Sequence, residues 1–453
     1  MPGPAGGYLY PAAIPMRALL TDLYELTMAA GYFEAGKAEE KATFELAFRR
    51  LPVNRNFILT AGLEQAVEYL LNLGFAEDEI QYLEGLPAFR TAPSAFWDYL
   101  REVRFTGDLF AMPEGTPVFP GEPVLTLRAP MIEAQIPETY LLATIGFQSM
   151  IATKAARCVE EAAGRPVVEF GTRRAHTPEA GVLGARAAYI GGCTGTSNTL
   201  TGFRFGIPVM GTAAHSWVMS FACEQEAFRK LQRALGESTI QLIDTYDTVK
   251  GAQHAAKVGR PLWGVRIDSG DFPSLSRQVR TILDEAGLGD AKIMASGDLD
   301  EWKIRELVKE GAPIDSFGVG TQLATSADAP TMSGTYKLVE LDIHGIKRYT
   351  AKYSDDKTSV PGAKQVFRAA ERDVIARAGE CGSGEALLRP VILDGKLVEP
   401  LPGLEKARAR AAESIARLAP ALRGLEPAEP RNVIYSRELR ELMARTEQNL
   451  MGR

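Results

Sequence analysis

The feature that most constrains the fold is a strand-and-helix alternation that begins near residue 165. Seven short apolar runs end in polar or glycine-rich tips: PVVEFGTRR, GGCTGTSN, IPVMGTAAHS, TIQLIDTYD, LWGVRIDSGD, KIMASGD and IDSFGVGTQ. Helical patterns over 218–235, 273–287 and 299–310 separate later runs. This alternation predicts a parallel sheet whose strands are buried on both faces. Seven units favour an irregular α/β (TIM-like) barrel, although composition alone does not exclude an open sheet.

The sequence on either side of this alternation predicts a second domain. Residues 105–130 are dense in Gly, Pro, Val and Leu, and residues 335–400 return to short strand-like runs. We expect these N- and C-terminal segments to build one β-rich α+β domain. The predicted divisions are an N-terminal arm over 1–16, an N-terminal β-rich α+β domain over 17–135, an α/β barrel catalytic domain over 136–334, and a C-terminal segment over 335–453 that completes the β-rich domain and adds terminal helices.

Charge and composition exclude several classes of protein. The 453 residues carry 51 basic and 57 acidic side chains, a net charge of −6, which argues against nucleic acid as the partner. The chain contains no run of 18 apolar residues, so we expect no membrane span, and its first residues lack a secretory signal pattern. Its four cysteines form no CxxC pair, so we expect reduced thiols in a cytoplasmic protein and no protein-only metal site.

The segment GVRIDSGD (264–271) is the most informative strand tip. Strand alternation sends Arg266 and Asp268 to the same face, at the end of the barrel where α/β enzymes build their active sites. An arginine there can hold a carboxylate or a phosphate with two hydrogen bonds, and the aspartate can accept hydrogen bonds from sugar hydroxyls. The alternative is an internal salt bridge at the end of a strand.

Three further tips predict a phosphate site. MASGD (294–298) and FGVGT (317–321) carry glycines that let backbone N–H groups approach an anion. EFGTRR (169–174) adds an aromatic ring, Phe170, and two adjacent arginines, although a solvated basic turn would have the same sequence. The phosphate-binding candidates are Arg173, Arg174, His176, Ser296, Gly297, Asp298, Gly318, Gly320 and Thr321.

GTAAHS (211–216) places one of only four histidines, His215, after a strand. Asp244 and Asp247, in the tip of the next strand, could orient its imidazole. A histidine held in this way can act as a base or accept a phosphoryl group. The alternative is a structural histidine near the start of a helix. We take His215, Asp268 and Asp247 as the catalytic candidates.

Together these motifs resemble the nicotinate phosphoribosyltransferase family. The matching segments are TDLYELTMA (21–29), EFGTRRAH (169–176), GTSN (195–198), GTAAHS (211–216), RIDSGD (266–271), ASGDLD (295–300) and FGVGT (317–321). They follow the family order over residues 20–370. The resemblance implies a homodimer with shared active sites. It also implies an ATP-dependent reaction of ligase type, in which phosphoribosyl pyrophosphate and nicotinate give nicotinate mononucleotide and pyrophosphate for NAD salvage.

The resemblance also implies roles for residues. Tyr24 of one subunit would stack on the nicotinate ring against Phe170 of the other, and Arg266 would hold the pyridine carboxylate. Asp268 would bind ribose hydroxyls, and His215 would be a phosphohistidine with Thr212 nearby. Arg173, Ser296, Gly297, Gly318, Gly320 and Thr321 would surround the 5-phosphate.

The loop AKYSDDKTSVPGAK contains Lys352, Lys357 and Lys364. By family analogy these lysines would contact pyrophosphate or ATP from a mobile loop, although a solvated loop would have the same composition. Mg²⁺ would arrive with the pyrophosphate.

Three alternatives remain at this stage. Nicotinamide phosphoribosyltransferases resemble this chain but carry an aspartate where it has Ser197, so Ser197 predicts the acid as substrate. Quinolinate phosphoribosyltransferases share the architecture but are shorter and work without ATP. A non-catalytic pyridine-nucleotide binding protein is disfavoured because Tyr24, Arg266, Asp268 and His215 are all intact.

Overall fold

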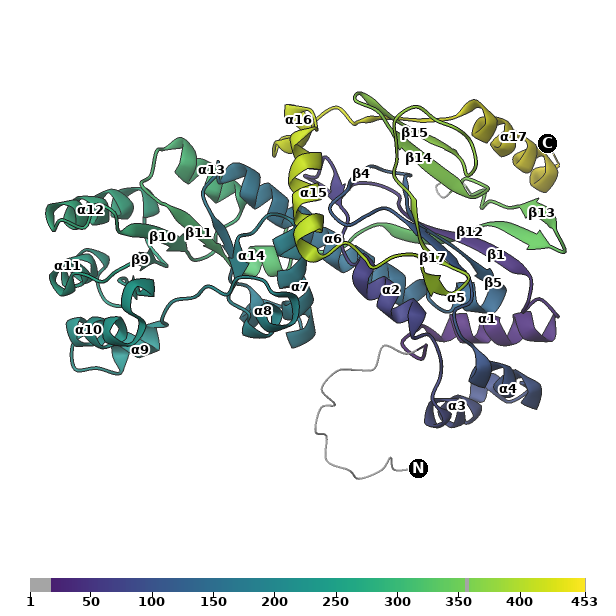
Figure 1. Cartoon of the computed structure of the whole chain (residues 1–453), viewed down its shortest axis with the longest axis horizontal. Coiled ribbons are helices and arrows are strands. Elements are labelled where there is room, and N and C mark those ends of the chain that lie inside the picture. Colours follow the sequence, from purple (N-terminus) through teal and green to yellow (C-terminus); the bar gives the residue numbers. More distant parts are fainter. Residues whose placement is uncertain (1–17, 355–357, 453) are drawn as a thin grey trace.

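The computed structural model describes residues 18–354 and 358–452, so the predicted arm over 1–16 and Lys357 lie outside the described residues. The described chain has two bodies, a β-rich domain and a parallel α/β domain (Figure 1). The long helix α6 (Glu138–Glu161) runs between them. Its first half contributes to the core of the β-rich domain and its second half to the core of the barrel.

Both ends of the chain build the β-rich domain, as predicted. In its seven-stranded sheet, β1 (Lys41–Phe48) lies between β5 (Pro123–Pro130) and β12 (Gly334–Ile343), and both pairings are antiparallel. The sheet order is β13-β12-β1-β5-β3-β17-β18. The remaining strands are β3 (Asp108–Ala111), β13 (Ile346–Tyr349), β17 (Arg389–Leu393) and β18 (Lys396–Leu397).

Smaller elements complete this domain. A four-stranded sheet has the order β16-β14-β15-β19, and β2 pairs with β4. The strands are β16 (Glu385–Ala386), β14 (Lys364–Arg368), β15 (Arg372–Arg377), β19 (Asn432–Tyr435), β2 (Ile58–Leu59) and β4 (Pro117–Val118). The helices are α1 (Leu23–Glu34), α2 (Leu63–Leu71), α3 (Glu77–Glu84), α4 (Ser94–Glu102), α5 (Met131–Gln135) and α17 (Arg437–Met451). The short helix α16 (Pro420–Arg423) instead buries Leu422 in the same apolar cluster as the barrel strands.

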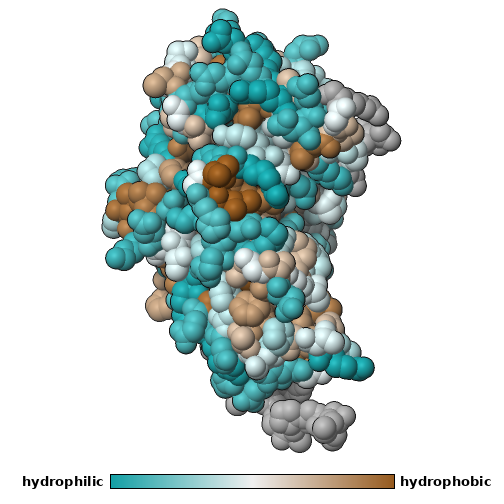
Figure 2. Space-filling model, turned by 90° about the vertical axis from the view of Figure 1, so that its right-hand side faces the viewer, coloured by the Kyte–Doolittle hydropathy of each residue, from teal (hydrophilic) through white to brown (hydrophobic). Residues whose placement is uncertain are grey.

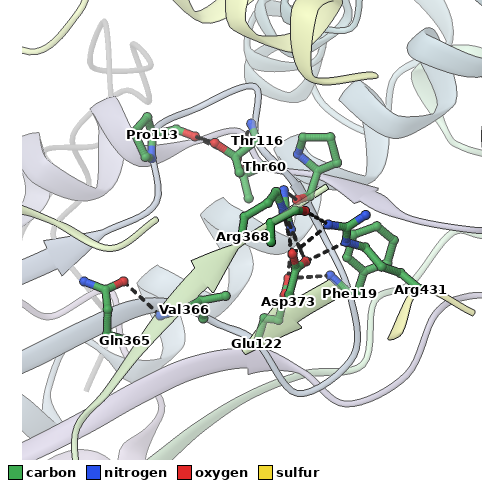
Figure 3. Close-up of polar contacts among 12 residues, drawn as sticks. Thr60, Pro113, Thr116, Phe119, Glu122, Gln365, Val366, Arg368, Asp373 and Arg431 are labelled. Atoms are coloured by element: carbon green, nitrogen blue, oxygen red, sulfur yellow. Dashed lines mark hydrogen bonds and ion pairs between the residues drawn. The ribbon is translucent and has the colours of Figure 1, made fainter. Parts of the chain in front are cut away.

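A buried ionic cluster joins the four-stranded sheet to the turn after β4 (Figure 3). Asp373 accepts hydrogen bonds from Arg431 Nε at 2.9 Å and from Arg368 Nη2 at 2.8 Å. Glu122 lies beside this pair with its side chain fully buried. Burial and the neighbouring Asp373 carboxylate raise the pKa of Glu122 well above its usual range, although Arg368 opposes the shift. The cluster therefore holds together two segments, around Glu122 and Arg368, that are about 250 positions apart in the chain.

The parallel strands follow one another around a ring, which confirms the irregular α/β barrel. Their order is β7-β6-β11-β10-β9-β8, so the first strand, β6, pairs with the last, β11. Val209 extends the ring beyond β7 through a parallel bridge to Thr196. The strands are β6 (Val167–Glu169), β7 (Gly195–Thr196), β8 (Ile240–Leu242), β9 (Gly264–Ile267), β10 (Lys292–Ser296) and β11 (Ser316–Val319). All seven predicted tips therefore belong to this ring.

The polar residues at the tips also start the helices that follow them. A side chain that accepts a hydrogen bond from the first turn satisfies a backbone N–H that has no partner within the helix. The caps are Thr177, Asn198, Asp247, Asp271 and Asp300. The barrel helices are α7 (Pro178–Ile190), α8 (Thr199–Phe205), α9 (His215–Met219), α10 (Glu224–Leu235), α11 (Thr248–Val258), α12 (Phe272–Glu285), α13 (Glu301–Lys309) and α14 (Thr321–Ala324).

The C-terminal segment touches both bodies. Helix α15 (Leu404–Ala416) packs on α7 and buries Ala407 and Ala411 in the same apolar cluster as the barrel strands. Figure 2 shows the side of the β-rich domain, which is mostly hydrophilic with separate apolar patches. Within the described ranges, every helix is too short or too polar to cross a membrane.

Candidate active site

The tips of β9 and β10 bring the predicted arginine and aspartate together. Arg266 donates from Nε to Ser296 Oγ at 2.6 Å and from Nη1 to Thr212 Oγ1 at 2.6 Å. Its Nη2 donates to Asp268 Oδ1, to which Ser296 also donates. The parallel register sets Arg266 opposite Met294, which brings Ser296 beside the end of β9. Four predicted site residues thus form one hydrogen-bonded group.

Two glycines make room for this group. The guanidinium of Arg266 lies 5.7 Å from the ring centre of Phe170, and a Cβ at Gly318 would come within 2.5 Å of that ring. Gly297 has φ +100°, and a Cβ there would come within 1.9 Å of the carbonyl oxygen of Asp268. Both positions therefore require glycine for packing, independently of any contact with an anion.

The electrostatics keep Asp268 ionised. Burial alone would raise the pKa of Asp268, but the hydrogen bonds from Ser296 and Arg266 and the charge of Arg266 outweigh burial and lower it. An ionised carboxylate beside a guanidinium can accept hydrogen bonds from hydroxyl groups. The Arg266 side chain retains 12% of its accessible surface and Asp268 retains 22%, so a small molecule can reach both.

His215 is held by Asp244. His215 Nε2 lies 3.2 Å from Asp244 Oδ1, while 41% of the His215 side chain stays exposed. Asp247, the other candidate for this contact, instead accepts a hydrogen bond from the backbone N–H of Lys250 at 2.8 Å. The geometry therefore gives the orienting role to Asp244, because the carboxylate of Asp247 is used to cap α11.

Sequence reasoning missed Glu169. This buried carboxylate ends β6 and accepts hydrogen bonds from Thr196 Oγ1 at 2.6 Å and from the backbone N–H of Gly171. Burial raises the pKa of Glu169, although both hydrogen bonds oppose the shift. Its backbone oxygen accepts from the N–H of Ser197 at 2.9 Å, so Glu169 joins two tips. An acidic residue directly after two strand valines was the available signal.

The other phosphate candidates occupy several positions. Arg173 and Arg174 lie in an exposed 3-10 turn after β6, and Ser197 is exposed at the tip of β7. Gly320 and Thr321 begin α14 at the tip of β11. The exposed residue Asp298 has φ +49°, and its carbonyl accepts from Lys303 Nζ at 2.8 Å.

His176 lies outside the Arg266 group. It lines a separate cavity of about 310 Å³ with residues of α6 and of the segment after α14, including Phe147 and Met332. The cavity wall is mainly apolar, which does not suit a phosphate dianion. His176 is therefore the phosphate candidate that the geometry favours least.

Two of the three loop lysines, Lys352 and Lys364, lie in the described residues and line the same cavity. This cavity has a volume of about 450 Å³, lies in the β-rich domain and is also lined by Arg49 and Lys337. Lys364 lies in β14 and is buried, and its ammonium pairs with Glu45 at 2.7 Å. Lys364 is therefore part of a strand rather than of a loop, and the Glu45 carboxylate pairs with its charge.

Tyr24 lies on α1 in the β-rich domain, far from the tips of β9 and β10 in the same chain (Figure 1). Its side chain is 46% exposed. Burial of the rest, together with Glu138 and Glu25, raises the pKa of its phenol. Contact with Phe170 would therefore require a second copy of the chain.

The arrangement supports three chemical operations. Arg266 can bind a carboxylate or a phosphate, Asp268 can bind hydroxyls, and His215 can accept a proton or a phosphoryl group at a free ring nitrogen. Among the described residues, no three His, Cys, Asp or Glu side chains gather in a way that could hold a metal ion.

Comparison with known proteins gives a consistent result. Three family models match: the nicotinate phosphoribosyltransferase N-terminal domain over 19–146, the nicotinate phosphoribosyltransferase family over 166–359, and the nicotinate phosphoribosyltransferase C-terminal domain over 364–443. Nicotinate phosphoribosyltransferase pncB2 of Mycobacterium tuberculosis is 45% identical, with 90% of this chain and 89% of that protein covered. Nicotinate phosphoribosyltransferase of Bacillus subtilis is 44% identical, with 78% and 73% covered. The crystal structure of human nicotinic acid phosphoribosyltransferase superimposes with a TM-score of 0.79 at 29% identity, over 94% of this chain and 99% of that chain.

Proposed function

The chain belongs to the nicotinate phosphoribosyltransferase family, and we propose that it transfers phosphoribosyl from phosphoribosyl pyrophosphate to nicotinate in an ATP-dependent reaction of ligase type. The products are nicotinate mononucleotide and pyrophosphate, as required for NAD salvage. The observation that carries the proposal is the pair of contacts at neighbouring strand tips, Arg266 with Asp268 and His215 with Asp244.

Arg266 and Phe170 provide the nicotinate site in this proposal. The guanidinium binds the carboxylate of nicotinate, and the Phe170 ring beneath it offers a face for the pyridine. Asp268, ionised next to Arg266, accepts hydrogen bonds from the ribose hydroxyls. Arg173 and the backbone N–H groups around Gly297, Gly318 and Gly320 are left for the 5-phosphate.

The transfer itself needs no protein nucleophile. The pyridine nitrogen attacks C1 of the sugar as pyrophosphate leaves, and positive charge develops on the sugar ring. We assign the stabilisation of that charge to the Asp268 carboxylate. Mg²⁺ would bind with the phosphate groups of the substrate rather than at a protein-only site, and it would supply positive charge for the leaving pyrophosphate.

In this proposal, His215 is the residue that reacts with ATP. Because Asp244 faces Nε2, Nδ1 is the ring nitrogen left free to accept the γ-phosphoryl group. Hydrolysis of this phosphohistidine couples ATP turnover to the transfer and draws it toward nicotinate mononucleotide.

A homodimer completes the proposal. Leu23, Tyr24 and Met28 give α1 an exposed apolar face, and Phe203 on α8 is 87% exposed near the barrel tips. Joining such surfaces would bring Tyr24 of one subunit toward Phe170 of the other. The basic cavity lined by Lys352 would then supply charge for pyrophosphate or ATP.

We also assign the enzyme to the cytoplasm. All four cysteines, Cys158, Cys193, Cys223 and Cys381, are free thiols, as expected in a reducing compartment.

The deciding experiment is pyrophosphate release from phosphoribosyl pyrophosphate and Mg²⁺, with nicotinate or nicotinamide, in the presence and absence of ATP. We expect release that depends on nicotinate and is stimulated by ATP. His215→Ala should abolish the stimulation, while His344→Asn, at an exposed turn with φ +53°, should not. Equal or better use of nicotinamide would overturn the choice of substrate. Binding without release for either base would favour the non-catalytic protein.

A further inference from the structure

The barrel ring is not hydrogen-bonded all the way around. Backbone ladders join each neighbouring pair of strands from β7 to β8, and Val209 bridges to Thr196. Among the described residues, no backbone hydrogen bond joins the strand segment around Val209 to β8, and this gap is a seam in the ring. The chain crosses this seam through Gly211–Ala214 and only then reaches α9, which begins with His215. In Figure 1 a thin loop leads across to helices α9–α12, at the far left.

Side chains close this seam. The first segment at the seam is the chain that follows Val209, and the second is the chain that follows β8. His215 of the first segment contacts Asp244 of the second. In the opposite sense, Glu224 of the first segment contacts His254 of the second, with Glu224 Oε2 2.8 Å from His254 Nδ1. Glu224 is nine residues after His215, and His254 is ten residues after Asp244. The two histidine–carboxylate pairs therefore join the same two segments side by side.

The second pair resembles the first in exposure, because each joins a buried carboxylate to a partly exposed histidine. The Glu224 side chain is 5% exposed, and its other oxygen, Oε1, is buried without a hydrogen-bond partner. A buried carboxylate with so few partners depends strongly on the contact that it has. Glu224 is also the first residue of α10, which packs through Phe228 against Ile243 and Ala252 of the second segment. Glu224 and His254 thus fix the start of α10 to α11.

We infer that Glu224 and His254 are positioning residues for the phosphorylation of His215. Helix α9 has only five residues and lies between the unbonded seam and α10, so α10 is its fixed end. If α10 shifts, His215 moves relative to Asp244, and Nδ1 loses its alignment with ATP. Arg266 lies on β9, and Asp268 and Phe170 directly follow β9 and β6. Both strands are hydrogen-bonded on both sides and do not depend on this pair. This inference rests on the proposed phosphorylation of His215.

The test separates the two half-reactions in the full-length enzyme. His254→Phe fills the space but removes the Nδ1 donor, whereas His254→Asn keeps a donor near the Nδ1 position. Radiolabel from γ-labelled ATP in His215 measures phosphorylation, and pyrophosphate release without ATP measures transfer. We expect His254→Phe to slow phosphorylation about tenfold or more, and His254→Asn to restore most of the rate. Transfer without ATP should stay within about twofold in both variants, as should all rates of the control His344→Asn.

The outcomes distinguish this inference from the proposed function. If wild-type enzyme takes up no label at His215, the ATP-dependent part of the proposed function fails, and this inference fails with it. If wild-type enzyme is labelled and His254→Phe is labelled equally fast, only the positioning role is overturned. An equal loss of both half-reactions with a lowered Tm, shared by His254→Asn, would also overturn it, since it would show a purely structural contact.

Discussion

Asp244 contacts His215 with one carboxylate oxygen and the tip of β9 with the other. Oδ1 lies 3.2 Å from His215 Nε2, and Oδ2 accepts from the backbone N–H of Asp268 at 3.0 Å and from Ser269 Oγ at 2.6 Å. One buried side chain thus sets the distance between the histidine and the Asp268 carboxylate. Asp244 therefore connects the phosphorylation site to the sugar site.

Asp244→Asn should impair phosphorylation of His215 more than transfer. The amide would donate to Nε2 and shift the ring proton to Nδ1, which removes the lone pair needed to accept a phosphoryl group. We expect the rate of label uptake from ATP to fall about 10²–10⁴-fold, as for other wrongly oriented histidines. Ser269→Ala, which removes one hydrogen bond to Asp244, is the milder control. Wild-type labelling of the asparagine variant would refute this role for Asp244.

The sequence predicted the barrel because its signal is local. Parallel strands buried on both faces must be apolar along their length, and their polar residues must gather where they end. Arg266, Asp268 and Ser296 were therefore found from strand tips alone, and the structure joins them through hydrogen bonds.

The sequence could not predict contacts that depend on distant pairing. Lys364 reads as a loop lysine because its partner, Glu45, lies 319 positions away on another strand. Asp244 and Asp247 look equivalent in IDTYD. The structure distinguishes them because α11 begins directly after Asp247, which caps that helix and leaves Asp244 to orient His215. Tyr24 and Phe170 cannot be tested by one chain, because their predicted contact is between subunits.

Arg266→Lys should weaken nicotinate use strongly. Lysine keeps the charge but loses the planar fork that reaches Ser296, Thr212 and Asp268 together. We expect kcat/KM for nicotinate to fall about 10- to 100-fold, the usual cost of one or two charged hydrogen bonds. Arg260→Lys, at an exposed pair with Asp290, is the matched control and should keep wild-type kinetics. Equal losses in the two variants would contradict a specific role for Arg266.

Gly297→Ala should reduce both activity and stability. A methyl group would clash with the Asp268 carbonyl, and alanine at φ +100° is strained by about 1–3 kcal/mol. Gly287→Ala separates the two effects, because Gly287 has φ +73° with open space around its Cβ position. Both variants should lower Tm, and only Gly297→Ala should raise KM for phosphoribosyl pyrophosphate. Unchanged kinetics in Gly297→Ala would remove Asp268 from the sugar site.

Ser197→Asp should shift the substrate preference from the acid toward the amide. Ser197 is exposed at the tip of β7, next to a backbone contact with buried Glu169. A carboxylate there would repel nicotinate and could accept a hydrogen bond from the amide of nicotinamide. We expect the ratio of kcat/KM for nicotinate to that for nicotinamide to fall. Ser197→Asn adds similar bulk without charge and should change the ratio less. An unchanged ratio in the aspartate variant would remove Ser197 from the nicotinate site.

Glu122→Gln should make folding stability less sensitive to alkaline pH. Folding raises the pKa of Glu122, so its stabilising contribution is full below the pKa of an unfolded glutamate, about 4.3, and is lost as pH rises through the folded pKa. Glutamine mimics the protonated form permanently. It can still accept from the backbone N–H of Phe119, which Glu122 Oε2 does at 2.9 Å. We therefore expect the variant to lose less stability than wild type between pH 5 and pH 9.

Urea unfolding across this pH range measures the effect, with Glu34→Gln as the control at an exposed glutamate of α1. The control removes the same charge outside the cluster, so it should follow the wild-type curve. Asp373→Asn should destabilise the protein at every pH by about 3–5 kcal/mol, because it leaves Arg368 and Arg431 without their buried carboxylate. A wild-type pH dependence in Glu122→Gln would mean that Glu122 is ionised in the folded protein. The two arginines would then neutralise two carboxylates rather than one, since Glu122 would share Arg368 with Asp373 as a second anion.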